Sequence, residues 1–214
     1  MPPMTQCDLV AARRLLGAGL LAVLALGGQP VLAQGVLAPP VAAACATCHG
    51  ASGEGSPAGI PRLAGQNADY LAHALSMFRA RTRASDVMQG VAQGLSEADM
   101  RALATYFSVQ HPPRVRDQPP APALVAAGKQ LAEAGAAPGV AACFSCHAAG
   151  GKGNGVRFPE IAGQPEAFLV ARLHEFQARA KQAPPPAGSM TAVSSTLNET
   201  QIREAAAYLS TLDP

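Results

Sequence analysis

A five-residue motif that occurs twice is the strongest constraint in this 214-residue sequence. Residues 45–49 read Cys-Ala-Thr-Cys-His, and residues 143–147 read Cys-Phe-Ser-Cys-His. Cysteines three positions apart on one helical turn point the same way, so both sulfurs can reach one edge of a porphyrin. Cys-x-x-Cys-His is the signature of c-type haem attachment, in which the histidine ligates the iron. The sequence therefore predicts two covalently bound haem c groups, attached at Cys45, Cys48, Cys143 and Cys146 and ligated by His49 and His147.

Three other uses of paired cysteines fit the motif less well. A thioredoxin-like Cys-x-x-Cys needs no histidine directly after it. A zinc site built from two such pairs leaves the histidine at the same offset in both copies unexplained. Structural disulfides are the third alternative, since an exported chain would meet an oxidising compartment. The repeated histidine favours haem over these alternatives.

The first 33 residues have the order of a secretory signal peptide. Arg13 and Arg14 precede an apolar run at 15–26, and Val31-Leu32-Ala33 offers a cleavage point. The run is shorter than the roughly 20 residues that a membrane-spanning helix needs, although an uncleaved anchor stays an alternative. Cleavage near Ala33 would leave four of the five cysteines, all of them inside the two motifs. We expect residues 1–33 to be removed on export to the periplasm.

Two copies of one unit account for the rest of the chain. A shift of 98 positions places Cys143 on Cys45 and residues 162–164, Ala-Gly-Gln, on residues 64–66. After four extra residues around 184–186 the shift becomes 102. The predicted domains are a first one at 34–110 and a second one at 123–214. They are joined by a proline-rich linker at 111–122, whose Pro-Pro pairs favour an extended spacer.

Both copies are helical by pattern, so the expected fold class is all-α. Asn67 can cap a helix that reaches about residue 81, and Pro165 can open the matching helix at its first position. Residues 96–99, Ser-Glu-Ala-Asp, resemble a capping box, and Asn198 opens the equivalent helix. Domains of this size with only 4% aromatic residues bury little apolar surface of their own, so the haem must supply much of each core.

The sixth ligand of each iron is expected to be a methionine. Met88 and Met190 match each other in the two copies, whereas Met77 and Met100 have no methionine counterpart. We expect the matched pair in loops between the two C-terminal helices of each copy. Core filling is the alternative role of a methionine. Ligation by histidine and methionine closes both axial positions, which suits electron transfer over substrate binding.

Other polar residues have supporting or ordinary roles. The backbone carbonyl of Pro61 or Pro159 could accept a hydrogen bond from the ligand histidine and so fix its tautomer. Arginines that could neutralise haem propionates are Arg62, Arg81 and Arg179. Three histidines lie outside the repeated pattern and are expected on helix faces or the surface: His73, His111 and His174.

Charge excludes one class of partner. The formal net charge is +2 and only 14% of the residues are charged, so the chain has no concentrated basic stripe of the kind that nucleic acid needs. We expect no nucleic-acid partner, and any patch that docks a redox protein must be modest.

The repeated motifs resemble class I cytochrome c. They comprise Cys-x-x-Cys-His, Pro-x-Leu-Ala-Gly-Gln or its variant, a Tyr/Phe-Leu helix, a methionine and a closing tyrosine. The tandem arrangement resembles the dihaem cytochrome c4 family over essentially the whole mature chain. That resemblance implies two class I cytochrome c domains about a pseudo-twofold axis, with propionates near the interface. It also implies the axial pairs His49 with Met88 and His147 with Met190.

One feature departs from this family. Pro39-Pro40 interrupts the N-terminal helix that usually precedes the first motif, whereas the second domain keeps a plausible helix at 124–133. The departure concerns how the first domain packs, and the haem motif itself is unaffected.

The resemblance implies an electron carrier and not an enzyme. Such a periplasmic cytochrome, sometimes loosely associated with the membrane, would pass electrons from a quinol-oxidising bc complex toward a terminal oxidase. The alternative is the dihaem electron-accepting subunit of a periplasmic dehydrogenase, for example one that oxidises sulfide with a flavin. A stand-alone peroxidase is a weaker alternative, because it needs an open position on the iron.

Overall fold

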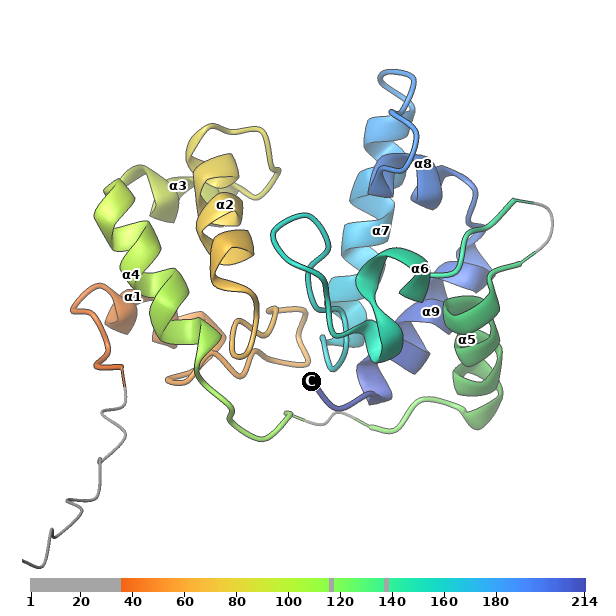
Figure 1. Cartoon of the computed structure of the whole chain (residues 1–214), viewed down its shortest axis with the longest axis horizontal. Coiled ribbons are helices and arrows are strands. Elements are labelled where there is room, and N and C mark those ends of the chain that lie inside the picture. Colours follow the sequence, from red (N-terminus) through yellow and green to blue (C-terminus); the bar gives the residue numbers. More distant parts are fainter. Residues whose placement is uncertain (1–35, 116–117, 137–138) are drawn as a thin grey trace, which may run out of the picture. The chain divides into compact units, whose positions relative to one another are not determined.

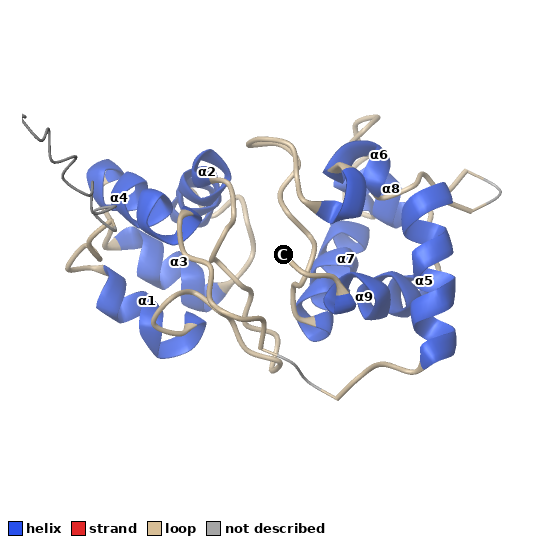
Figure 2. Cartoon of the chain, turned by 60° about the horizontal axis from the view of Figure 1, so that its bottom comes forward, coloured by secondary structure: helices blue, strands red, loops and turns tan. Residues whose placement is uncertain are grey.

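The computed structural model describes residues 36–115, 118–136 and 139–214. Within these ranges the regular elements are helices, no strand occurs, and three isolated bridges lie in loops. The all-α prediction is therefore confirmed (Figures 1 and 2). The predicted signal peptide lies outside the described residues.

The helices fall into two groups in chain order, which we call the first and second lobe. The first lobe contains α1 (Ala42–His49), α2 (Ala68–Arg79), α3 (Asp86–Gln93) and α4 (Glu97–Ser108). The second lobe contains α5 (Pro122–Ala134), α6 (Phe144–His147), the 3-10 turn η1 (Ala149–Gly151), α7 (Glu166–Ala180), α8 (Met190–Ser195) and α9 (Glu199–Thr211).

Side-chain caps begin the helices where the sequence places them. Asn67 accepts the Tyr70 N–H at 3.0 Å and starts α2. Full capping boxes start α4 at Ser96 and α9 at Asn198. Pro165 differs slightly from its prediction, because it lies at the N-cap of α7 instead of its first position. Its ψ of 135° is extended, so the helix begins one residue later.

Equivalent helices build the two cores, α2 with α4 in the first lobe and α7 with α9 in the second, where α5 also takes part. In the first lobe Leu71 of α2 packs against Leu103 and Phe107 of α4, and Ala42 of α1 joins them. In the second lobe α5 packs along α9, and the buried core joins residues of α5, α7 and α9: Ala132, Leu169, Ala206, Tyr208 and Leu209. The positions equivalent to α5 under the shift of 98 are residues 24–36, nearly all of which lie outside the described residues, so the interruption of a first-lobe helix by Pro39-Pro40 stays a prediction.

Gly128 is what allows α5 to lie so close to α9. A Cβ atom at this position would lie 1.9 Å from the Glu204 carbonyl oxygen, which is backbone and cannot move aside. We therefore expect Gly128→Ala to destabilise the second lobe by about 1 to 3 kcal/mol, the usual cost of overpacking. Urea unfolding followed by far-ultraviolet circular dichroism measures this loss.

The matched control for this substitution is Gly90→Ala in α3. Gly90 is also helical, but apart from its chain neighbours and the nearby backbone of α3 no atom lies within 4 Å of its ideal Cβ position. Alanine is the better helix former by up to about 1 kcal/mol, so this variant should be as stable as the parent or more so. Equal losses in the two variants would contradict the close approach of α5 and α9.

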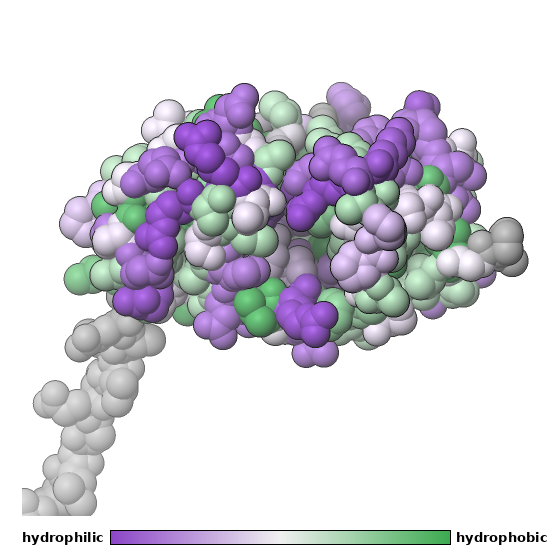
Figure 3. All heavy atoms as spheres, turned by 90° about the horizontal axis from the view of Figure 1, so that it is seen from above, coloured by the Kyte–Doolittle hydropathy of each residue, from purple (hydrophilic) through white to green (hydrophobic). Residues whose placement is uncertain are grey.

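The surface mixes residue types. On the face shown in Figure 3, hydrophilic and hydrophobic residues are interspersed. Large exposed apolar residues include Leu37 and Val87, which are 89% and 70% exposed. Among the helices of the described residues, none is both long enough and apolar enough to cross a bilayer.

Candidate haem-binding sites

The first motif lies at the C-terminal end of α1. Cys45 is half-buried and packs against the first-lobe core, while Cys48 is exposed. His49, the last residue of the helix, is 7% exposed. Its Nδ1 lies 2.9 Å from the Pro61 carbonyl oxygen. A carbonyl can only accept, so Nδ1 carries the proton and Nε2 keeps its lone pair for a metal.

The second motif repeats this geometry around α6. Cys143 is the N-cap of α6 and packs against the second-lobe core, with Cys146 one turn later. His147 is 5% exposed, and its Nδ1 lies 2.7 Å from the Pro159 carbonyl oxygen. Both hydrogen bonds expected from the sequence are thus confirmed. The four cysteines of the described residues form no disulfide.

Burial sets the protonation of these side chains. It lowers the pKa of His49 and of His147, and the hydrogen bonds to the proline carbonyls oppose this only in part. Both imidazoles are therefore neutral near pH 7, which is the form that binds iron. Burial also raises the pKa of the Cys143 thiol to about 11, and raises that of Cys45. Both thiols are therefore mostly protonated near pH 7, which is their less nucleophilic form.

The matched methionines lie in short helices, and their predicted placement in loops is wrong. Met88 is the third residue of α3 and Met190 the first residue of α8, and both are half-buried. Ser85 and Ser189 cap these helices through their side chains. The two serines are 104 positions apart, so α8 begins two residues later than the shift of 102 implies. The serine before each of these helices, which can act as an N-cap, was the sequence signal that could have predicted them.

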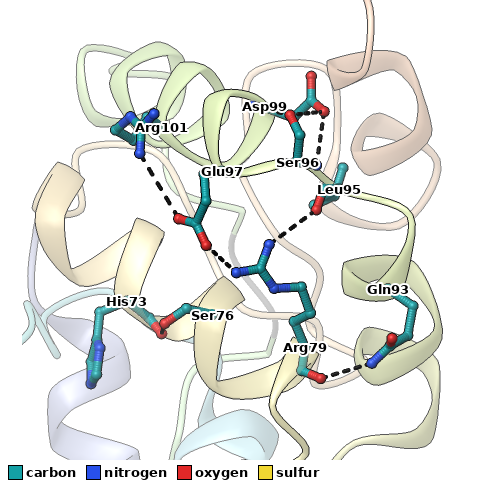
Figure 4. A network of polar contacts seen from close by, with 9 residues as sticks. All are labelled: His73, Ser76, Arg79, Gln93, Leu95, Ser96, Glu97, Asp99 and Arg101. Carbon is teal, nitrogen blue, oxygen red and sulfur yellow. Dashed lines mark hydrogen bonds and ion pairs between the residues drawn. The ribbon is translucent and has the colours of Figure 1, made fainter.

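A polar network holds α3 between its neighbours in the first lobe (Figure 4). Arg79, at the end of α2, donates to the Leu95 carbonyl at 3.4 Å and pairs with Glu97 of α4. Gln93 of α3 donates to the Arg79 carbonyl at 2.7 Å. The segment that carries Met88 is thus tied to α2 and α4.

The second lobe uses a different residue for the same contact. Gln177 occupies the position equivalent to Arg79, and its Nε2 donates to the carbonyls of Ser194 at 3.0 Å and Leu197 at 2.8 Å. Leu197 is equivalent to Leu95 under the shift of 102. Glu199, equivalent to Glu97, pairs with His174 instead. The alignment of the two copies identifies these equivalent positions, but the sequence does not reveal which of them are in contact within a lobe.

Two buried arginines show whether the residues around the motifs are suited to binding haem. Arg62 is 4% exposed, and its Nη1 has no hydrogen-bond partner in the described residues. Arg83, which sequence reasoning missed, is 6% exposed and has an unpartnered Nε. Buried donors of this kind need an acceptor, and haem propionates are carboxylates that provide one. Together with the paired cysteines and the free Nε2 atoms, these residues fit haem c. Two of the arginines suggested by the sequence, Arg81 and Arg179, are exposed.

The remaining histidines lie where the sequence analysis expects them. All three are exposed, on α2, on the segment after α4 and on α7, respectively: His73, His111 and His174.

Residues 40–108 and 125–213 match the model of the cytochrome c family, and the chain belongs to this family. Each of the two matches contains one Cys-x-x-Cys-His motif, so the chain carries two covalently bound haem c groups.

Comparison with relatives narrows the class further. The chain is 39% identical over 174 residues to the thiosulfate dehydrogenase electron acceptor of Thiomonas intermedia, covering 80% of each sequence. It is 29% identical to cytochrome c4 of Azotobacter vinelandii, covering 78% of this chain and 84% of the relative. The structure of reduced cytochrome c4 from Pseudomonas stutzeri matches with a TM-score of 0.70 and 30% identity, over 79% of this chain and 94% of the other.

A second solved structure matches equally well. Thiosulfate dehydrogenase from Marichromatium purpuratum aligns with a TM-score of 0.70 and 38% identity, over 78% of this chain and 36% of that larger chain. The protein is accordingly a dihaem electron carrier of the cytochrome c4 type.

Proposed function

We propose that this carrier accepts electrons from a periplasmic thiosulfate dehydrogenase. The observation behind this proposal is the ranking of the relatives. Two thiosulfate dehydrogenase electron acceptors are 39% and 38% identical to the chain, whereas four cytochromes c4 are 29% to 33% identical. The proposed role is of the same class as the alternative given by the sequence analysis, an electron acceptor for a periplasmic dehydrogenase. The substrate of the dehydrogenase is thiosulfate instead of sulfide.

The proposed ligand set is His49 with Met88 in the first lobe and His147 with Met190 in the second. Thioether bonds at the two cysteine pairs would fix each haem, whose iron takes up one electron at a time. The histidines present Nε2 because the proline carbonyls hold the proton on Nδ1. The methionines would supply the second protein ligand of each iron, which would exclude substrates and favour electron transfer.

The proposed location is the periplasm, after removal of residues 1–33. We propose domains at 34–110 and 123–214, joined by residues 111–122. The described helices support these limits, because α4 ends at Ser108 and α5 begins at Pro122, the last residue of the proposed linker. Downstream, the electrons would pass to a terminal oxidase.

A direct competition of donors tests the physiological role. The oxidised protein is mixed in a stopped-flow instrument with a thiosulfate dehydrogenase plus thiosulfate, and separately with a reduced bc complex. We expect faster reduction by the dehydrogenase. The second candidate, a carrier that accepts electrons from the bc complex, is supported by the cytochrome c4 match over 94% of the Pseudomonas stutzeri chain. Faster reduction by the bc complex would favour that candidate.

The contact made by Gln177 yields a local prediction about the second haem. In Gln177→Leu two carbonyls around the end of α8 lose their donor, so α8 and Met190 are held less firmly. We expect about half of the long-wavelength sulfur-to-iron charge-transfer band of the oxidised protein to disappear at a lower temperature than in the parent. Absorption recorded during heating measures this change.

Arg203→Ala is the control for that experiment. Arg203 pairs with Glu199 on the surface, with 61% and 51% of the two side chains exposed, so its loss should cost between zero and about 1 kcal/mol. If both variants lose the band at the same temperature, Gln177 has no special role in holding α8.

A further inference from the structure

Two buried glutamines join the lobes in a reciprocal way. Gln164 of the second lobe accepts the Arg62 N–H at its Oε1 and donates from Nε2 to the Arg62 carbonyl, both at 3.0 Å. Gln66 of the first lobe does the same with Glu160, and both of its distances are 2.9 Å. The shift of 98 relates Gln66 to Gln164 and Arg62 to Glu160. The two contacts are therefore equivalent, because in each one a glutamine binds the same backbone position of the opposite lobe.

The bound backbone positions directly follow the prolines that hold the ligand histidines. In the first lobe, the carbonyl of the Pro61–Arg62 peptide group accepts from His49 Nδ1, and the N–H of the same group donates to Gln164. In the second lobe, the Pro159–Glu160 peptide group links His147 to Gln66 in the same manner. One peptide group thus stands between each histidine and a glutamine of the opposite lobe.

Hydrogen bonds that share a peptide group reinforce one another. When the N–H of a peptide group donates to an oxygen, electron density moves toward the carbonyl oxygen of the same group, which becomes a stronger acceptor. A stronger acceptor on Nδ1–H makes the imidazole a more basic ligand. A more basic imidazole ligand stabilises ferric iron over ferrous iron and so lowers the reduction potential of the haem.

We propose that Gln164 tunes the haem ligated by His49, and that Gln66 tunes the haem ligated by His147, each across the contact between the lobes. The two glutamines are positioning residues that act through a peptide group and a histidine. This proposal rests on the ligation by His49 and His147 given under the proposed function. The opposite charges of Arg62 and Glu160 attract each other at the same contact and help to hold it.

The two effects of losing a glutamine have opposite signs. Weakening the carbonyl acceptor raises the potential of the haem in the opposite lobe. Mere loosening of the contact would admit water, which stabilises the more highly charged ferric form and lowers the potential. If the glutamine only held the lobes together, its loss would therefore lower the potentials of both haems.

The test uses the full-length protein with both haems and the substitution Gln164→Leu. Individual potentials come from a redox titration followed by the haem methyl resonances in NMR spectra, assigned through nuclear Overhauser contacts between each haem and the side chains of its own lobe. We expect the ferrous-to-ferric ratio of the His49 haem, at a fixed applied potential, to rise at least threefold, which is about 28 mV at about 59 mV per tenfold change. The His147 haem should shift by less than half as much.

Gln66→Leu is the matched control and should give the mirror result, a rise confined mainly to the His147 haem. A larger shift in the haem of the substituted residue's own lobe, a fall in both potentials, or no shift in either haem overturns the proposal. If Gln164→Leu fails to accumulate with two haems, Gln164→Asn replaces it, because the shorter amide cannot reach both Arg62 atoms, and the same criteria apply.

A negative result for tuning by the glutamines can be distinguished from a negative result for the proposed ligands or for the proposed electron donor. The charge-transfer band reports the axial ligands, and the donor competition reports the partner. Both can give their expected results while the glutamine variants leave the potentials unchanged.

Discussion

Replacing Cys45 and Cys48 together with alanine is expected to leave one covalently bound haem per chain and to unfold the first lobe. The core cluster of that lobe is built from α1, α2 and α4, and Cys45 of the haem motif packs against it. Without haem the lobe has little apolar surface left to bury. A haemochrome assay after denaturation counts the remaining haem, and far-ultraviolet circular dichroism measures the lost helix.

The converse pair, Cys143→Ala with Cys146→Ala, is the control for this prediction. It should also leave one haem, but the loss of helix should be smaller, because α5 and α9 still pack through Gly128 and Ala132. Two haems in either double variant would contradict the attachment sites. Equal loss of helix in both would contradict the role given to α5.

Replacing Met88 with alanine should remove methionine ligation from the first haem alone. The thioether favours the ferrous state, so its loss lowers the potential of that haem. We expect a fall of at least tenfold in the ferrous-to-ferric ratio, or about 59 mV. The sulfur-to-iron band should lose half its intensity, while the haem ligated by Met190 keeps its potential. A redox titration and an absorption spectrum measure both effects.

Met77→Leu and Met100→Leu are the controls for the ligand assignment. Met100 is 1% exposed in the first-lobe core, so exchange for a residue of similar volume should cost less than about 1.5 kcal/mol and leave both potentials unchanged. Halving of the band by the Met77 substitution, with the band spared in Met88→Ala, would show that the first domain is aligned wrongly.

Much of this fold is local in origin, and that part was predictable. Asn67, Ser96 and Asn198 cap helices because a short polar side chain can reach the N–H groups of the next turn. The bonds from the two histidines to the carbonyls of Pro61 and Pro159 were also predictable, since each histidine and its proline lie 12 positions apart in both copies.

Other features depend on contacts between distant segments. The repeat identified Met88 and Met190 as a pair, but their helices start at Ser85 and Ser189, which the alignment did not match. Arg83 was missed because its burial arises from contacts with α2 that no local pattern in the sequence reveals. Its burial depends on Tyr70, to which it donates at 3.3 Å, and on Phe78, over whose ring it lies.

The sequence by itself determined the all-helical class, the two haem motifs and the pairing of equivalent residues, because these follow from local propensity and from repetition. Only the tertiary structure decided that Gln66 and Gln164 cross between the lobes. A glutamine in an Ala-Gly-Gln stretch has two donor protons and an acceptor oxygen that water satisfies equally well in an isolated lobe. Burial of Arg62 and Glu160 backbone against the opposite lobe removes that water, and the amide then becomes the partner that these groups require.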